Sequence, residues 1–259
     1  MEAYATSDLH RDPVGFLVIL NIAWTVSAQQ PARPAAQGGQ AAPLPRGAAA
    51  TPRPPVFFHE AWKLTQGTQV MSQQWVGNPN LVLKLYGPGI GGADIEHGLN
   101  INTRREPDNV AFVWSGMTEG NWALTLRDKN NFVNLKGALT KIRIKSMQSG
   151  FQVLRPVIKT ADGKFFVADQ GDGLSVDWHE MEYNVGDLRW LAFDEKNAFE
   201  VPWQGEGLGF QNPDLSRVDE IGFTTMQRGT GHGAGGSARI ASIDVVGYPV
   251  PRNAPAKTN

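Results

Sequence analysis

The chain has 259 residues, a formal net charge of −1 and no cysteine. Without cysteine there can be no disulfide framework, no thiolate metal ligand and no cysteine nucleophile. A nearly balanced charge gives no electrostatic basis for binding nucleic acid or an anionic membrane surface. We therefore expect no nucleic acid as a partner, and no membrane once the leader described next has been removed.

The N-terminal segment has the pattern of an export signal. Residues 14–26 form a mostly apolar stretch of 13 residues, which ends in the small-x-small sequence Val26-Ser27-Ala28. A membrane-spanning helix needs roughly 20 apolar residues, whereas the core of a signal peptide is shorter. We predict that residues 1–28 are a cleaved signal peptide and that the mature protein is secreted or periplasmic. A retained N-terminal anchor is the alternative.

The leader is followed by a segment that cannot form a core of its own. Residues 29–55 contain eight alanines and seven prolines, and Leu44 is their only large apolar side chain. Such a composition buries too little surface to offset the entropy of ordering. We predict a disordered linker over residues 29–55, a single folded domain over residues 56–250 and a disordered tail over residues 251–259.

Within the domain, apolar residues recur with a period of two. In "KIRIK", Ile142 and Ile144 alternate with basic residues, which is the pattern of a strand with one buried and one wet face. Glycine, asparagine and aspartate separate about ten such segments, and no long amphipathic helix stands among them. The sequence therefore predicts an all-β fold, a single antiparallel β-sandwich. The expected strands cover residues 81–86, 110–114, 121–127, 131–135, 139–147, 151–159, 164–168, 178–185, 189–193, 218–225 and 237–248.

Two segments between these strands are long for a sandwich, residues 87–109 and 194–216. Long loops in compact domains are more often functional than idle. We expect the first of them to border a ligand site.

Three stretches carry a resemblance to a known family. The C-terminal part runs from "NPDLSRVDEIGFTTM" to "GSARIASIDVVGY" (212–248), preceded by "DWHEMEYNVGDLRW" (177–190), and the domain begins with "VFFHEAWK" (56–63). Together they resemble galactose-binding-like jelly rolls of the carbohydrate-binding module family 11 type, a fold shared with the complex I intermediate-associated protein 30 domain. The resemblance implies a jelly-roll sandwich and a carbohydrate ligand. The family's sugar-contacting residues do not transfer to positions of this chain.

The same resemblance implies a structural calcium ion, because domains of this kind often hold one near their first strand. It places the metal at Glu60 in "FFHEAW" and Asp244 in "ASIDVV". The alternative is that Glu60 is a surface acid and Asp244 caps a turn. A nucleotide cofactor is not expected, since the glycine-rich run at 229–236 leads into a strand and not into a helix N-terminus that could hold phosphate.

The stretch "WSGMTEGNWALTLRDKNNF" (114–132) holds the candidate ligand residues. Alternation predicts that Trp122 lies in the core, whereas Thr125 and Arg127 face outward. We expect a ligand-facing rim at which an aromatic plane stacks on a sugar ring and charged groups bind its hydroxyls. The residues assigned to this rim are Trp114, Glu119, Arg127 and Asp128.

Two functions remain open from the sequence. The first is an exported carbohydrate-recognising sandwich without chemistry of its own. The second is a small secreted glycoside hydrolase or polysaccharide lyase that uses two carboxylates as acid and base. Its candidates are Glu119, Glu180 and Glu182, although a solvated strand face is the favoured explanation of Glu180 and Glu182. The sequence favours the binding protein.

Overall fold

The computed structural model describes residues 52–87, 98–104, 109–115, 122–150, 152–193, 210–225 and 237–253. The chain divides into two compact units, residues 1–50 and 51–259, and every described residue belongs to the second unit. The predicted signal peptide and nearly all of the predicted linker therefore lie outside the described residues.

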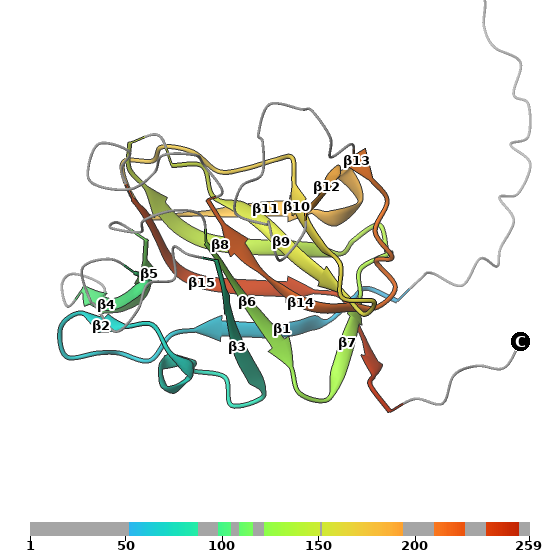
Figure 1. The fold of residues 1–259 in the computed structure, drawn as a ribbon, viewed down its shortest axis with the longest axis horizontal. Coiled ribbons are helices and arrows are strands. Elements are labelled where there is room, and N and C mark those ends of the chain that lie inside the picture. The colour runs from blue at the N-terminus through green and yellow to red at the C-terminus, as the bar shows by residue number, and fades with distance from the viewer. Residues whose placement is uncertain are drawn as a thin grey trace, which may run out of the picture. The chain divides into compact units, whose positions relative to one another are not determined.

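Two antiparallel sheets form the domain, and Figure 1 shows them as two layers. In sheet A the strand order is β11-β8-β15-β5-β4-β2, and β1 also pairs with β15. Its strands are β1 (Val56–Ala61), β2 (Gln69–Val70), β4 (Asn100–Arg104), β5 (Val110–Trp114), β8 (Lys141–Gln148), β11 (His179–Asn184) and β15 (Ala238–Val246).

In sheet B the order is β13-β12-β10-β9-β14-β6-β3, and β7 pairs with both β14 and β16. Its strands are β3 (Leu81–Tyr86), β6 (Ala123–Asp128), β7 (Asn131–Asn134), β9 (Arg155–Thr160), β10 (Phe165–Ala168), β12 (Trp190–Phe193), β13 (Phe210–Gln211), β14 (Val218–Thr224) and β16 (Tyr248–Pro251). The described residues also contain two short 3₁₀ turns, η1 (Gln73–Trp75) and η3 (Val185–Asp187).

The period-two pattern sorts the side chains between the core and the surface. Along β8 every second residue is buried, so that Ile142 and Ile144 point into the sandwich while Lys141 and Arg143 point out. Both sheets contribute apolar side chains of this kind to one continuous core, and such burial is the main stabilising term of a sandwich. The predicted antiparallel β-sandwich is confirmed.

Three aromatic side chains connect the two sheets. The ring of Phe223 on β14 meets Trp62 edge-on at 6.5 Å between centroids and Trp122 at 6.1 Å. Trp122 is fully buried, as its place in the alternation predicts. The indole Nε1 of Trp62 also donates a hydrogen bond to the backbone carbonyl of Ile240, at 2.9 Å. Trp62 thus links the end of β1 to Ile240 in the first part of β15.

The prediction for the outer face of β6 needs a correction. Thr125 points away from the core, as predicted, but its side chain is fully buried. Its hydroxyl donates to the carboxylate of Glu220 at 2.5 Å, and the Tyr86 hydroxyl donates to the same carboxylate at 2.9 Å. The Lys159 ammonium lies 3.8 Å from Glu220. This face of sheet B is closed by a polar cluster of its own side chains, which single-strand alternation does not reveal.

The loop and domain limits also differ from the prediction. The segment 87–109, predicted as one loop, contains β4, and the strand predicted over 237–248 divides at Gly247 into β15 and β16. A Cβ on Gly247 would lie 2.6 Å from the Val133 side chain, so the chain passes there too closely for any other residue. Arg252, assigned to the tail, donates to the carbonyl of Asp128 at 2.9 Å. The domain therefore extends beyond residue 250.

The linker boundary shifts in the same way. The backbone carbonyl of Pro55 accepts a hydrogen bond from Gly247, and that of Pro52 accepts one from the Tyr248 hydroxyl. Residues 52–55 are therefore held against the sandwich. In the part of the chain that the structure describes, no helix has the length and apolar character needed to cross a membrane.

We predict that Trp62→Phe destabilises the domain more than Trp122→Phe, by about 1–3 kcal/mol, because a buried carbonyl loses its donor only in the first variant. Both indoles pack on Phe223, but the Nε1 of Trp122 has no hydrogen-bond partner among the described residues. Urea unfolding of the two variants measures the difference. Equal losses would show that the bond to Ile240 contributes nothing.

Candidate functional site

The outer face of sheet A carries a cleft made of two adjoining hollows, of about 290 and 320 Å³. They share Asn102, Phe112 and Arg239, so they form one continuous depression across β4, β5, β15 and β8. We call it the sheet A cleft. It is lined by Thr68, Asn102, Thr103, Arg104, Phe112, Trp114, Met147, Trp178 and Arg239.

Strand register brings these side chains together from distant parts of the sequence. Arg239 on β15 pairs with Trp114 on one side and with Met147 on the other. Phe112 pairs with Asn102 of β4. Cross-strand partners project from the same face of a sheet, and the alternate residues of these strands, such as Val113 and Ile240, fill the core.

Aromatic side chains form the walls of the cleft. The rings of Phe112 and Trp178 contact each other with centroids 5.7 Å apart and planes tilted by 59°. Trp114 and Trp178 are both half-buried. Their indole N–H groups have no hydrogen-bond partner among the described residues. Both indole nitrogens are buried, so the walls offer mainly flat apolar surface to the cleft.

The described lining of the cleft contains two arginines, Arg104 and Arg239. Burial lowers the pKa of the Arg239 guanidinium below its ordinary value, and the nearby charge of Arg104 lowers it further. A lowered arginine pKa means that the cation has lost hydration without gaining a compensating negative neighbour. Among the lining residues none is acidic.

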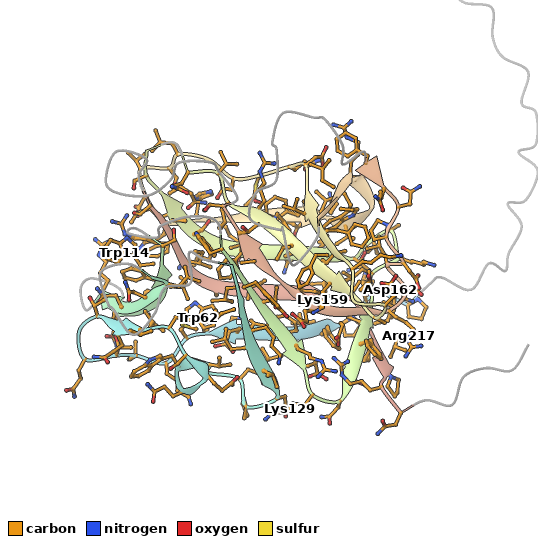
Figure 2. The ribbon with its side chains drawn as sticks, viewed as in Figure 1. Trp62, Trp114, Lys129, Lys159, Asp162 and Arg217 are labelled. Atoms are coloured by element: carbon orange, nitrogen blue, oxygen red, sulfur yellow. The ribbon has the colours of Figure 1, made fainter. Side chains whose placement is uncertain are left out.

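Of the four predicted ligand residues, the structure places only Trp114 in the cleft. Arg127 and Asp128 lie at the end of β6 in sheet B, and Glu119 lies outside the described residues. Figure 2 shows Trp114 beside β4 and β5, whereas Lys129, the neighbour of Asp128, lies at the far tip of the β6–β7 hairpin. Trp114, Arg127 and Asp128 are therefore not brought together.

Arg127 and Asp128 have structural partners instead. The Arg127 Nε donates to the Asp219 carboxylate at 2.9 Å. Asp128 accepts backbone N–H bonds from Asn130 and Asn131, at 2.9 and 2.7 Å, and so stabilises the turn of the hairpin. This is the usual role of aspartate at such a position.

Most of the lining residues were not predicted from the sequence. Phe112 stands two residues before Trp114 and so shares its face, a signal that was present in the strand 110–114. Likewise Arg239 alternates with the inward-facing Ala238 and Ile240. The signal for Trp178 is weaker, since it precedes β11 on a turn. What no local pattern shows is that β5, β15 and β8 are neighbours.

The carboxylates proposed for catalysis lie on the exposed side of the edge strand β11. Glu182 accepts a hydrogen bond from the Arg143 Nε at 2.7 Å and another from the Lys141 ammonium. The bond from Lys141, and to a smaller extent the bond from Arg143, lowers the pKa of Glu182 below its ordinary value. Glu180 lies 4.0 Å from the Arg143 Nε. A carboxyl held ionised in this way is poorly suited to act as a general acid.

The proposed calcium ligands do not fit a common site. Glu60 is fully buried on the core side of β1, where it accepts N–H bonds from Gly77 at 2.6 Å and Asn78 at 2.9 Å. Asp244 faces the opposite side of sheet A and binds His59 at 2.5 Å. Residues on opposite faces of a sheet cannot share one ion. The described residues contain no cluster of three or more potential metal ligands, and calcium binding by this chain remains a prediction.

The comparisons with known proteins found similar structures of low sequence identity. No protein-family model matches the chain, and no similar sequence was found among curated proteins. One similar structure is the family 11 carbohydrate-binding module of a cellulosomal cellulase of Clostridium thermocellum, with 13% identity, a TM-score of 0.41 and coverage of 69% of this chain and 93% of its own. The family 11 module from the same organism in complex with a β-1,3-1,4-mixed-linked tetrasaccharide has 14% identity and a TM-score of 0.41. The match covers 72% of this chain and 99% of the module.

A family 29 carbohydrate-binding module complexed with cellulohexaose is also similar, with 12% identity, a TM-score of 0.33 and coverage of 66% of this chain and 95% of its own. The family 11 type resembled by the sequence is thus among the structures that the fold resembles. Identities and TM-scores this low carry no information about the ligand, which has to be inferred from the cleft itself.

We predict that Glu60→Gln destabilises the domain, by about 1–3 kcal/mol, because the glutamine NH2 group cannot accept one of the two backbone N–H bonds that the carboxyl oxygens of Glu60 accept. Burial raises the pKa of the Glu60 carboxyl above its ordinary value. The stability due to this group is therefore fully present below the ordinary pKa and is lost as the pH rises through the raised value. Urea unfolding of both proteins should show a larger difference near pH 4 than near pH 7. A constant difference would contradict the assignment.

Proposed function

We propose that the domain binds a carbohydrate in the sheet A cleft. The observation that supports this most directly is the pair of tryptophans, Trp114 and Trp178, which border a continuous hollow on the face of a β-sandwich. A pyranose ring has an apolar face that an indole plane can cover, and it carries hydroxyls around its edge. A ligand site that combines aromatic walls with a few placed polar groups suits such a molecule.

The polar lining matches the needs of ring hydroxyls. Asn102 and Thr68 offer both donors and acceptors, and the two are joined by a hydrogen bond of 2.9 Å from the Asn102 amide to the Thr68 hydroxyl. That bond fixes the orientation of the Asn102 amide at the floor of the first hollow. The Arg239 guanidinium adds further donors to the same hollow.

Binding without catalysis accounts for the described residues better than an enzyme does. The cleft lining contains no acid, and Glu182 is engaged with Lys141 and Arg143. General acid–base hydrolysis of a glycosidic bond needs two carboxyl groups across the bond. Glu119 is not described, so product analysis after incubation with a bound polysaccharide is the measurement that separates the two functions.

We predict that Trp114→Ala weakens glycan binding about tenfold or more, since stacking on an aromatic plane contributes on the order of 1 kcal/mol beyond the buried area. The measurement is affinity electrophoresis in gels that contain soluble polysaccharides. Phe210→Ala is the matched control, because it removes an exposed aromatic from sheet B. Unchanged mobility of Trp114→Ala on every polysaccharide that retards the parent protein would contradict the proposal.

We further propose that the protein is exported, on the evidence of the apolar stretch at residues 14–26 and the Val26-Ser27-Ala28 pattern. Expression of the full chain in a secreting host should give a mature protein that begins at Gln29. N-terminal sequencing and intact mass measure this directly. A soluble cytoplasmic protein that keeps residues 1–28 would rule it out.

A further inference from the structure

The position of Arg239 sets it apart from other arginines of the domain. It lies between the two hollows of the sheet A cleft and lines both. Its side chain makes no hydrogen bond or ion pair with any described residue, whereas Arg127, Arg189 and Arg252 each donate to a carboxylate. A half-buried cation without a counter-charge is costly.

The surroundings of Arg239 strengthen this imbalance. The neighbouring charge in the cleft is another cation, Arg104, and the other lining residues are neutral. Acidic side chains elsewhere on this face of sheet A have partners outside the cleft, as Asp244 has in His59 and Glu182 in Arg143. The chain as a whole carries a formal charge of −1, so the positive charge of the cleft is local.

We propose that the sheet A cleft selects acidic glycans, and that Arg239 binds the carboxylate or sulfate group of a sugar held between Trp114 and Trp178. This inference rests on the proposed function and names its ligand class. A guanidinium presents parallel N–H donors that match a carboxylate or sulfate in a bidentate manner. The two tryptophans border different hollows, so neighbouring sugar units can pack on them while the acidic group points at Arg239.

The test uses pairs of oligosaccharides that differ only in the anionic group. One pair is an oligogalacturonate and its carboxyl-reduced form, and the other is a sulfated galactan oligosaccharide and its desulfated form. Titration calorimetry with the full mature protein should show the acidic member of at least one pair binding about tenfold or more tightly. That preference should fall as salt screens the charge. The pair that shows it distinguishes carboxylate from sulfate.

Variants then assign the preference to Arg239. Arg239→Gln should abolish it, and Arg239→Lys should keep only part of it, because lysine retains the charge without the planar fork. Arg217→Gln is the matched control. It removes the same charge on the loop before β14, far from Trp114 in Figure 2, where the guanidinium packs over Phe132 at 4.6 Å. The control should leave the preference unchanged.

Failure of this inference and failure of the proposed function give different results. Suppose that both members of each pair bind equally, or that the neutral members bind more tightly, and that Trp114→Ala still weakens binding. This result would overturn the preference for acidic glycans and leave the proposed carbohydrate site standing. A preference that survives Arg239→Gln would overturn the role of Arg239. No binding of any glycan, or binding insensitive to Trp114→Ala, would overturn both.

Discussion

The hydrogen bond from the Trp62 indole to the Ile240 carbonyl lies where strand β15 of sheet A changes its neighbouring strand. Strand β15 pairs with β8 along nearly its whole length, but on its other edge it changes neighbour, from β5 near Ile240 to β1 from Ser242 onward. A carbonyl at such a change of partner would lack a backbone donor inside the protein, and a buried orphan is costly. Trp62, which directly follows β1, supplies the donor.

The cleft is a consequence of that change of neighbour. Because β5 flanks only the first part of β15, the outward side chains of Phe112 and Trp114 stand beside Arg239, while β1 brings His59 beside Asp244 further along. The two halves of the same face therefore differ in chemistry. One half carries paired charges such as His59 and Asp244. The other half is an aromatic hollow that contains Arg239.

The sequence predicts those properties that depend on one strand at a time. Alternation places Trp122 in the core and Trp114 on a surface, because the period of two is a local property of an extended chain. Nearness in the sequence fails as a guide for Arg127 and Asp128, which are close to Trp114 in the chain but belong to the other sheet. The metal site implied by the resemblance meets another obstacle, because the strands of Glu60 and Asp244 are adjacent but their side chains leave opposite faces. Pairing between β5 and β15 joins residues more than a hundred positions apart, and no local pattern encodes it.

The direction of β15 separates the cleft from both ends of the described chain. Arg239 lies near the start of β15 beside Trp114, whereas Val246 ends the strand beside Val56. The two sites are therefore roughly 23 Å apart at the rise of an extended strand. The carbonyl of Pro52 is bound by Tyr248, and Arg252 is bound to Asp128, at that second end. The first and last described residues therefore both lie at the end of β15 that is remote from the cleft. A polymer bound across Trp114 and Trp178 would not reach them.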